Sequence, residues 1–133
     1  MKKIPKVSVQ APAAVVMVRP HQFTVNTETA VDNSFQKVAK ASIHHSALAY
    51  DEMTKAVGIL ESHGVRVHRF DEERDATPDS VFPNNWFSTH AGGHIAIYPM
   101  KALNRRLERR RDVIEMLKAE YRVQDVIDYS GLE

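Results

Sequence analysis

The chain alternates short apolar segments with longer segments in which apolar residues recur at helical spacing. Residues 13–18 form a continuous apolar run, and residues 42–63 carry an apolar stripe of helical period. Residues 65–70 then alternate between apolar and polar side chains, as a strand with a polar face does. Strands that alternate with helices in this way predict an α/β fold.

The second half of the chain repeats this order of patterns. The segments are a strand-like stretch at 81–87, a hairpin turn at Gly92-Gly93, a strand at 95–98, a helical stripe at 103–121 and a strand at 123–127. The shared rhythm indicates a repeated module of about 60–65 residues. We expect a single domain over residues 1–133, with a first module at about 13–70 and a second at about 71–133.

The composition excludes several classes of function. Lysine and arginine number 18 against 17 aspartates and glutamates, so the net charge of +1 creates no field that attracts nucleic acid or an anionic membrane. No apolar run approaches the roughly 20 residues that span a bilayer, and the run at 13–18 is too short for a secretory signal. We therefore expect a cytoplasmic protein. The absence of cysteine excludes disulfides, thiolate metal sites and a cysteine nucleophile within this chain.

The first candidate site is a polar segment that runs from Pro78 to Trp86. If this segment is a strand, a bulge at Pro83 makes Asp79 and Asn85 converge, with Asn84 beside them. Convergent donors and acceptors beside aromatic side chains suit a small polar ligand. Because asparagine, aspartate and proline are also ordinary turn residues, a turn without a binding role is the alternative.

The second candidate site is rich in arginine and runs from Asn104 to Arg111. It holds five arginines in seven residues at the start of a predicted helix, where Arg105 and Arg106 oppose the helix dipole. Arginine can clamp a carboxylate or a phosphate through two parallel hydrogen bonds. A solvated helix face and a nucleic-acid patch are the alternatives, and the even charge balance argues against the patch.

A third candidate, Arg19, lies just past the first predicted strand. Loops at the carboxyl ends of strands are favoured ligand positions in α/β folds, although a plain connection also fits. Two glycines separate His90 from His94, so these histidines do not form a helical metal-binding pair, and no glycine-rich phosphate loop is present. We therefore expect neither a metal nor a cofactor.

These segments together resemble the amidinotransferase and arginine deiminase superfamily. The motifs that carry the resemblance are Val18-Arg19-Pro20, Asn26 to Gln36, Pro78 to Trp86, Ile97-Tyr98-Pro99-Met100 and Asn104 to Arg111. Within the superfamily, the sequence is most similar to the bacterial citrulline-hydrolase-like amidinotransferases. The resemblance spans residues 13–133, which is nearly the whole chain.

The resemblance implies a pentein-type, five-bladed α/β propeller in which each blade is a ββαβ module; this chain would hold about two of the five. Members attack a guanidino or ureido carbon with a cysteine near the C-terminus, assisted by a histidine and by a glutamate just beyond this chain's last residues. The covalent intermediate requires a thiolate. We therefore expect the N-terminal substrate-binding portion of a Cys-dependent C–N hydrolase or amidinotransferase, without a catalytic residue and inactive alone.

The resemblance also implies the substrate contacts. Asn85 stands where relatives have an aspartate that pairs with the substrate guanidinium, and Asp79 and Asn84 flank it. Arg105 and Arg106 match an arginine pair that holds the α-carboxylate of arginine-like amino acids. Because Asn85 is neutral and offers an acceptor as well as donors, it complements a neutral ureido group, so we expect a preference for citrulline over arginine.

Two other functions stay open at this point. The same residues could bind an amino acid without chemistry, or the chain could be the remnant of a truncated gene. Two modules taken from a closed ring leave strand edges unpaired, and such edges invite pairing with another chain. We therefore expect a homo-oligomer formed through exposed blade edges, or a flexible monomer that aggregates.

Overall fold

The computed structural model describes residues 11–32 and 42–133, so part of one motif of the resemblance, residues 33–36, lies outside the described residues. The elements, in chain order, are β1 (Ala14–Pro20), α1 (Thr27–Ala30), α2 (Ser42–Ser62), β2 (Arg66–Glu72), the 3₁₀ turn η1 (Pro83–Asn85), β3 (Phe87–His90), β4 (His94–Ile97), α3 (Leu103–Arg106), α4 (Arg111–Glu120), β5 (Asp125–Asp128) and the 3₁₀ turn η2 (Ser130–Leu132). Helices and strands alternate, which confirms the predicted α/β class.

The first sheet consists of β1 and β2, which pair in parallel. Val16 lies opposite His68, and Val18 lies opposite Phe70. Parallel neighbours need a crossover connection, and α2 lies within it. Gly64 follows α2 with a φ of +82°, the left-handed conformation that commonly ends a helix. The sequence predicts this helix, its glycine cap and both strands.

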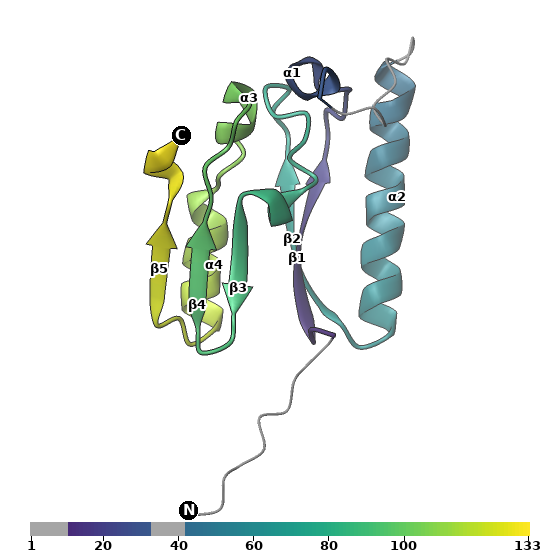
Figure 1. The fold of residues 1–133 in the computed structure, drawn as a ribbon. Coiled ribbons are helices and arrows are strands. Elements are labelled where there is room, and N and C mark those ends of the chain that lie inside the picture. The colour runs from purple at the N-terminus through teal and green to yellow at the C-terminus, as the bar shows by residue number, and fades with distance from the viewer. Residues whose placement is uncertain (1–10, 33–41) are drawn as a thin grey trace, which may run out of the picture.

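The second sheet has the order β3-β4-β5. β3 and β4 are antiparallel neighbours, whereas β5 returns parallel to β4 after α4. The carboxyl ends of β1, β2 and β4 therefore lie at the same end of the molecule, at the top of Figure 1. The order β3-β4-α4-β5 is that of a ββαβ unit, while the propeller and the module boundary near residue 70 stay predictions.

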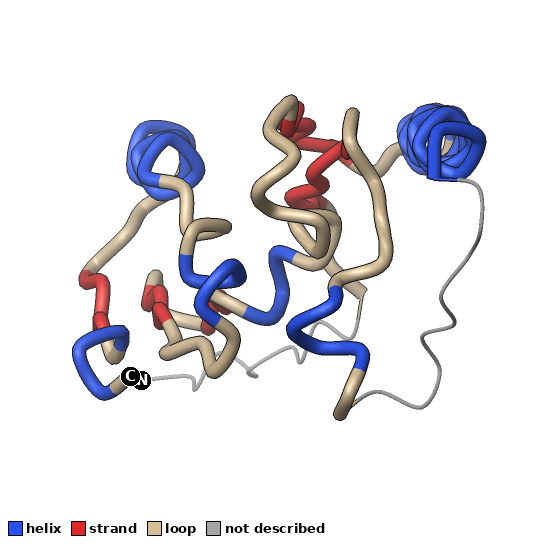
Figure 2. Tube along the Cα trace, turned by 90° about the horizontal axis from the view of Figure 1, so that it is seen from above, coloured by secondary structure: helices blue, strands red, loops and turns tan. Residues whose placement is uncertain are grey.

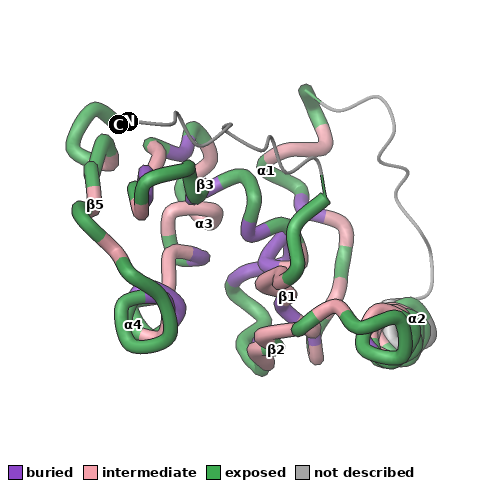
Figure 3. Tube along the Cα trace, turned by 90° about the horizontal axis from the view of Figure 1, so that it is seen from below, coloured by how far each residue is buried: buried purple, intermediate pink, exposed green. Residues whose placement is uncertain are grey.

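The core lies between α4 and the strands. Its buried members are Trp86, Phe87, Ile95, Met100, Val113, Ile114 and Leu117. Val16 of β1 and Phe70 of β2 pack against this cluster, so the first sheet shares the core of the second. Seen along the strands, β1 and β2 lie between α4 and α2, and purple buried segments concentrate between the two helices (Figures 2 and 3).

The helix α2 covers the outer side of β1 and β2 (Figure 1). Val57 is its buried residue on the core side, whereas Leu48 and Ile59 remain exposed. Across residues 45–62, the part of α2 whose burial the structure describes, its contribution to the core is therefore small. Among the residues that the structure describes, no helix combines the length and the hydrophobicity that a membrane crossing requires.

The predicted helix over 103–121 is wrong in one respect, because the structure breaks it into α3 and α4. Arg110, in the break, donates a hydrogen bond to the backbone oxygen of Asp71 at 2.7 Å, and Arg74 donates one to the backbone oxygen of Leu107 at 3.2 Å. Leu103 remains 66% exposed, although helical spacing places it on the apolar stripe. Tertiary hydrogen bonds therefore override the local helical pattern here.

The predicted strand at 81–87 is also wrong for every residue before Phe87. Phe82, Asn85 and Trp86 each donate a backbone hydrogen bond to the residue three positions earlier, so the chain forms consecutive turns and η1 instead of a bulged strand. Pro83 starts η1, a position at which its missing N–H costs nothing. The strand β3 begins only at Phe87.

The predicted hairpin turn is confirmed and gives a test of the fold. Gly93 has a φ of +83°, and a Cβ there would collide with the backbone oxygen of Arg122. We expect Gly93→Ala to destabilise the chain by about 1–3 kcal/mol, measured by urea unfolding. The matched control is Gly58→Ala in α2, where a Cβ meets nothing within 4 Å and should stabilise the helix by about 0.5–1 kcal/mol. Equal effects of the two substitutions would contradict this account of the turn.

Candidate functional site

A polar cluster forms where the loops after β1, β2 and β4 meet. We define the Arg105 cluster as Asp79, Asn85, Arg105 and Glu108. Asp79 comes from the loop after β2, Asn85 ends η1, Arg105 lies in α3, and Glu108 lies in the break before α4. Loops at the carboxyl ends of strands are common ligand positions in α/β folds.

Arg105 is the centre of this cluster. Its Nε donates to Oε1 of Glu108 at 3.1 Å, and its Nη2 donates to Oε2 of Glu108 at 3.0 Å. Nη2 also donates to Oδ1 of Asn85 at 3.1 Å, and Nε lies 3.7 Å from Oδ2 of Asp79. The side chain of Arg105 keeps 15% of its surface exposed, and Asn85 is exposed, so a ligand can reach both from solvent.

Asp79 lies beneath this exposed part of the cluster. It is 5% exposed, and its Oδ2 accepts hydrogen bonds from Nδ2 of Asn26 at 2.8 Å and from the hydroxyl of Thr29 at 3.2 Å. These partners turn the carboxylate toward the loop that follows β1. Asp79 therefore acts on the exposed surface through Arg105, and not by facing solvent.

Asn26 is a neighbour of the cluster that the sequence analysis did not name as a site residue. It is buried, and its side-chain amide uses its full hydrogen-bonding capacity: Nδ2 donates to Asp79 and Asn104, and Oδ1 accepts from Asn104 Nδ2 and from the backbone N–H of Glu28. The last bond caps α1. An asparagine followed two residues later by a glutamate is a helix-start signal, which could have drawn attention to it.

Glu108 is the second missed residue. It is 2% exposed, and burial raises its pKa above the usual range of a glutamic acid. The hydrogen bonds from Arg105 act in the opposite direction, whereas the charges of Asp79 and Glu72 raise the pKa further. Helical spacing would place Glu108 on an exposed face, so no sequence signal points to its burial.

Three residues predicted for the site lie outside the Arg105 cluster. Asn84 lines a different cleft, described below. Arg106 donates to the backbone oxygen of Met100 at 2.8 Å and faces Glu133 at 3.7 Å. The expectation that Arg106 pairs with Arg105 on one carboxylate is therefore not met by this geometry, because consecutive residues of a short helix point in different directions.

Arg19 also lies apart from the cluster. Its Nε donates to Oδ1 of Asp71 at 2.7 Å, and its guanidinium lies 4.2 Å from the centre of the Tyr50 ring. Burial on its own would raise the pKa of Asp71, but the hydrogen bonds from Arg19 and His21 bring it below its usual range. Arg19 therefore anchors α2 to the first sheet.

The dipole argument for the arginine-rich segment is also corrected. Arg105 and Arg106 lie in α3, which is a single turn of four residues, and not at the start of a long helix whose dipole they would oppose. Arg109 binds both carboxylate oxygens of Glu133, and this hydrogen bonding lowers the pKa of Glu133 to about 2. The arginines of this segment thus all have acidic partners, with Glu133 shared by Arg106 and Arg109, which argues against a nucleic-acid patch.

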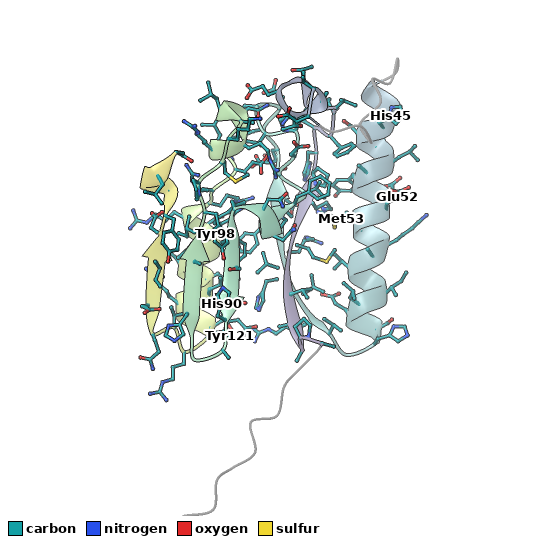
Figure 4. All side chains as sticks on the ribbon, in the orientation of Figure 1. His45, Glu52, Met53, His90, Tyr98 and Tyr121 are labelled. Carbon is teal, nitrogen blue, oxygen red and sulfur yellow. The ribbon has the colours of Figure 1, made fainter. Side chains whose placement is uncertain are left out.

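The cleft that Asn84 lines has a volume of about 850 Å³ and lies between β1 and the hairpin of β3 and β4. Met53, His90 and Tyr121 contribute to its wall from α2, from β3 and from the end of α4 (Figure 4). The hydroxyl of Ser88 lies 2.7 Å from Nε2 of His90, on the same wall. In residues 11–32 and 42–133, no group of three or more candidate ligands is arranged to hold a metal ion.

The burial of Glu108 predicts a pH-dependent stability. The raised folded-state pKa means that, above the ordinary value of 4.5, the folded state retains a proton that the unfolded state has lost. The contribution of Glu108 to the free energy of unfolding therefore falls as pH rises from about 4.5 through the raised pKa. Urea unfolding of the wild type and of Glu108→Gln at several pH values measures this contribution as the difference between their free energies of unfolding, because the glutamine does not titrate. A stability difference that stays flat, or that favours the wild type more as pH rises, would contradict the raised pKa.

The comparisons with known proteins bear on this site. No curated protein and no solved structure matches the chain. The sequence model of the family described as N,N dimethylarginine dimethylhydrolase, eukaryotic, matches residues 19–133, which include the whole Arg105 cluster. This family is part of the guanidino-modifying superfamily, so the superfamily resemblance is confirmed, while the bacterial citrulline-hydrolase-like group is not the one matched. The chain belongs to the eukaryotic N,N dimethylarginine dimethylhydrolase family.

Proposed function

We propose that this chain supplies the substrate-holding part of a hydrolase that acts on the guanidino or ureido group of an arginine-like amino acid. The observation that carries the proposal is the contact between Arg105 and Asn85, which places a cation beside an exposed amide. A cation is the natural partner of an α-carboxylate, and an amide can bind the other end of the ligand. The family match supports the guanidino class of substrate.

The orientation of Asn85 supports a ureido ligand in particular. Nη2 of Arg105 can only donate, so the atom of Asn85 at 3.1 Å is its oxygen. The Nδ2 group of Asn85 is then left as the donor that meets a ligand. A donor complements the carbonyl of a ureido group, whereas a guanidinium offers only further donors. We therefore propose that this site prefers citrulline-type ligands. We also propose that, within the superfamily, the chain is most similar to the bacterial citrulline-hydrolase-like group.

The reaction itself needs groups that these residues do not include. Hydrolysis breaks a C–N bond and forms a C–O bond from water, and the resemblance assigns the attack on carbon to a thiolate. The 133 residues contain no cysteine. We propose that the nucleophile comes from outside this stretch of sequence and that the chain alone binds without turnover. A module that binds an amino acid without chemistry is the second candidate, and the same lack of a nucleophile supports it.

The substrate preference is tested by calorimetric titration with L-citrulline, L-arginine and N,N-dimethyl-L-arginine. We expect the wild type to bind citrulline more tightly than arginine. Asn85→Asp should raise the affinity for arginine by about ten-fold, or about 1.4 kcal/mol, because a carboxylate pairs with the guanidinium. The control is Asn84→Asp, which makes the same charge change one residue away, where the side chain lines the other cleft. It should change the affinity for arginine less than two-fold.

Three results would count against the proposed function. The ureido preference fails if the wild type binds arginine as tightly as citrulline. The assignment of the site to Asn85 fails if Asn84→Asp has the same effect as Asn85→Asp. Conversion of any of these ligands to product by the purified chain would show that its own residues carry the chemistry.

We also propose that β1–α2–β2 and β3–β4–α4–β5 are two modules of a propeller and that the chain self-associates in the cytoplasm. β3 is at an edge of its sheet, and β1 and β2 form a sheet of two strands, so unpaired edges are present. Light scattering of the purified chain should therefore give the mass of a dimer or a larger assembly. A stable monomer at high protein concentration would contradict the self-association.

A further inference from the structure

Glu108 has no role in the proposed function so far, yet it accepts two hydrogen bonds from Arg105, more than any other residue that the structure describes. Both of its carboxylate oxygens accept hydrogen bonds from that guanidinium, at 3.1 Å and 3.0 Å. Its position depends on the break between α3 and α4, visible in Figure 1, where the backbone N–H of Glu108 donates to the oxygen of Arg105 at 3.1 Å. A continuous helix would not close this turn.

A second buried carboxylate fixes the break itself. Glu72 accepts hydrogen bonds from Nε and Nη2 of Arg74 at 2.8 Å and 2.7 Å. The same Nη2 donates to the backbone oxygen of Leu107, the residue before Glu108. The peptide that precedes Glu108 is therefore tied to the end of β2, and Glu108 is held at its place below Arg105.

The hydrogen bonds of Arg105 can be counted atom by atom. A guanidinium has five N–H donors, of which Nε carries one and each Nη carries two. Nε and one donor of Nη2 bind Glu108, and the other donor of Nη2 binds Asn85. Within the part of the chain that the structure describes, the two donors of Nη1 are the ones that make no hydrogen bond. The exposed part of Arg105 can therefore offer a ligand only Nη1.

We propose that Glu108 is a positioning residue that fixes the rotation of the Arg105 guanidinium so that Nη1 faces the carboxylate of the ligand. The proposal rests on the proposed function, because that function supplies the carboxylate. The carboxylate of the ligand then contacts Arg105 through the single nitrogen Nη1. An arginine with all its donors free commonly binds a carboxylate through two nitrogens at once. It also means that Arg105 is already ordered before the ligand arrives, which lowers the entropy lost on binding.

The first test observes Arg105 directly by ¹⁵N NMR of arginine side chains, with Arg105→Lys identifying its signals. In the wild type at neutral pH, we expect separate Nη1 and Nη2 signals, because two hydrogen bonds to Glu108 stop rotation about the Cζ–Nε bond. Adding L-citrulline should shift the Nη1 signal more than the Nε and Nη2 signals. Signals that are already averaged in the wild type, or a ligand shift on Nε and Nη2 alone, would overturn the proposal.

The second test uses Glu108→Gln, which keeps the shape of the side chain but replaces one of its two acceptor oxygens with an NH2 donor, so the two parallel hydrogen bonds to Arg105 cannot both form. Its ligands are L-citrulline and L-citrullinamide, in which a neutral amide replaces the carboxylate. We expect the variant to lose about ten-fold in affinity for citrulline while its affinity for citrullinamide changes less than two-fold. Glu115→Gln is the matched control, since Glu115 is exposed on α4 and pairs with Lys118, and it should change neither affinity.

The outcomes separate this proposal from the proposed function. Equal losses for the two ligands would assign Glu108 a purely structural role and overturn the proposal, as would unchanged citrulline binding. If no ligand binds the wild type, the proposed function fails, and resolved Nη signals that average in Glu108→Gln would still show that Glu108 orients Arg105. If Glu108→Gln does not fold, the wild-type signals and their response to citrulline decide the proposal.

Discussion

One part-buried cation, the guanidinium of Arg105, organises the upper end of this molecule. Arg105 lies between two carboxylates, Asp79 and Glu108, that are themselves almost entirely removed from water. Burying any one of these charges without its partners would be costly, so the three groups must come together for the loops to fold. The loops after β2 and β4 are thereby fixed to each other, and Asn26 fixes the loop after β1 to both.

This constraint explains why the helix breaks where local propensity would continue it. A helix over 103–121 would keep Glu108 on a regular helical face and would leave the backbone oxygen of Leu107 in an intrahelical bond. Instead, Arg74 takes that oxygen, and Glu108 turns inward to Arg105. The hydrogen bonds gained in tertiary structure replace those lost in the helix, so the break brings Glu108 to Arg105 without leaving these groups unpaired.

The sequence predicts those parts of the structure that depend on local patterning, which are the strands β1, β2, β4 and β5, the helix α2, the glycine cap and the hairpin turn. It also predicts that Asp79, Asn85 and Arg105 belong to one site, although it assumes a bulged strand where the chain forms turns. Side-chain direction is what local patterning does not contain. Local patterning therefore could not predict that Arg19 and Arg106 contact other partners. Nor could it predict the burial of Glu108, which depends on contacts with residues far away in the sequence.

The charge balance of the Arg105 cluster determines how it can bind a carboxylate. Two acidic side chains, Asp79 and Glu108, lie against the single guanidinium of Arg105, so the surroundings of Arg105 weaken its net attraction for an anion. Binding must then come from directed hydrogen bonds at short range, whose strength depends on how well the donors are aligned. An arginine that rotates freely would lose that alignment. In the proposed function, the alignment of Arg105 is therefore what determines the affinity, and a ureido group at Asn85 adds no charge because it is neutral.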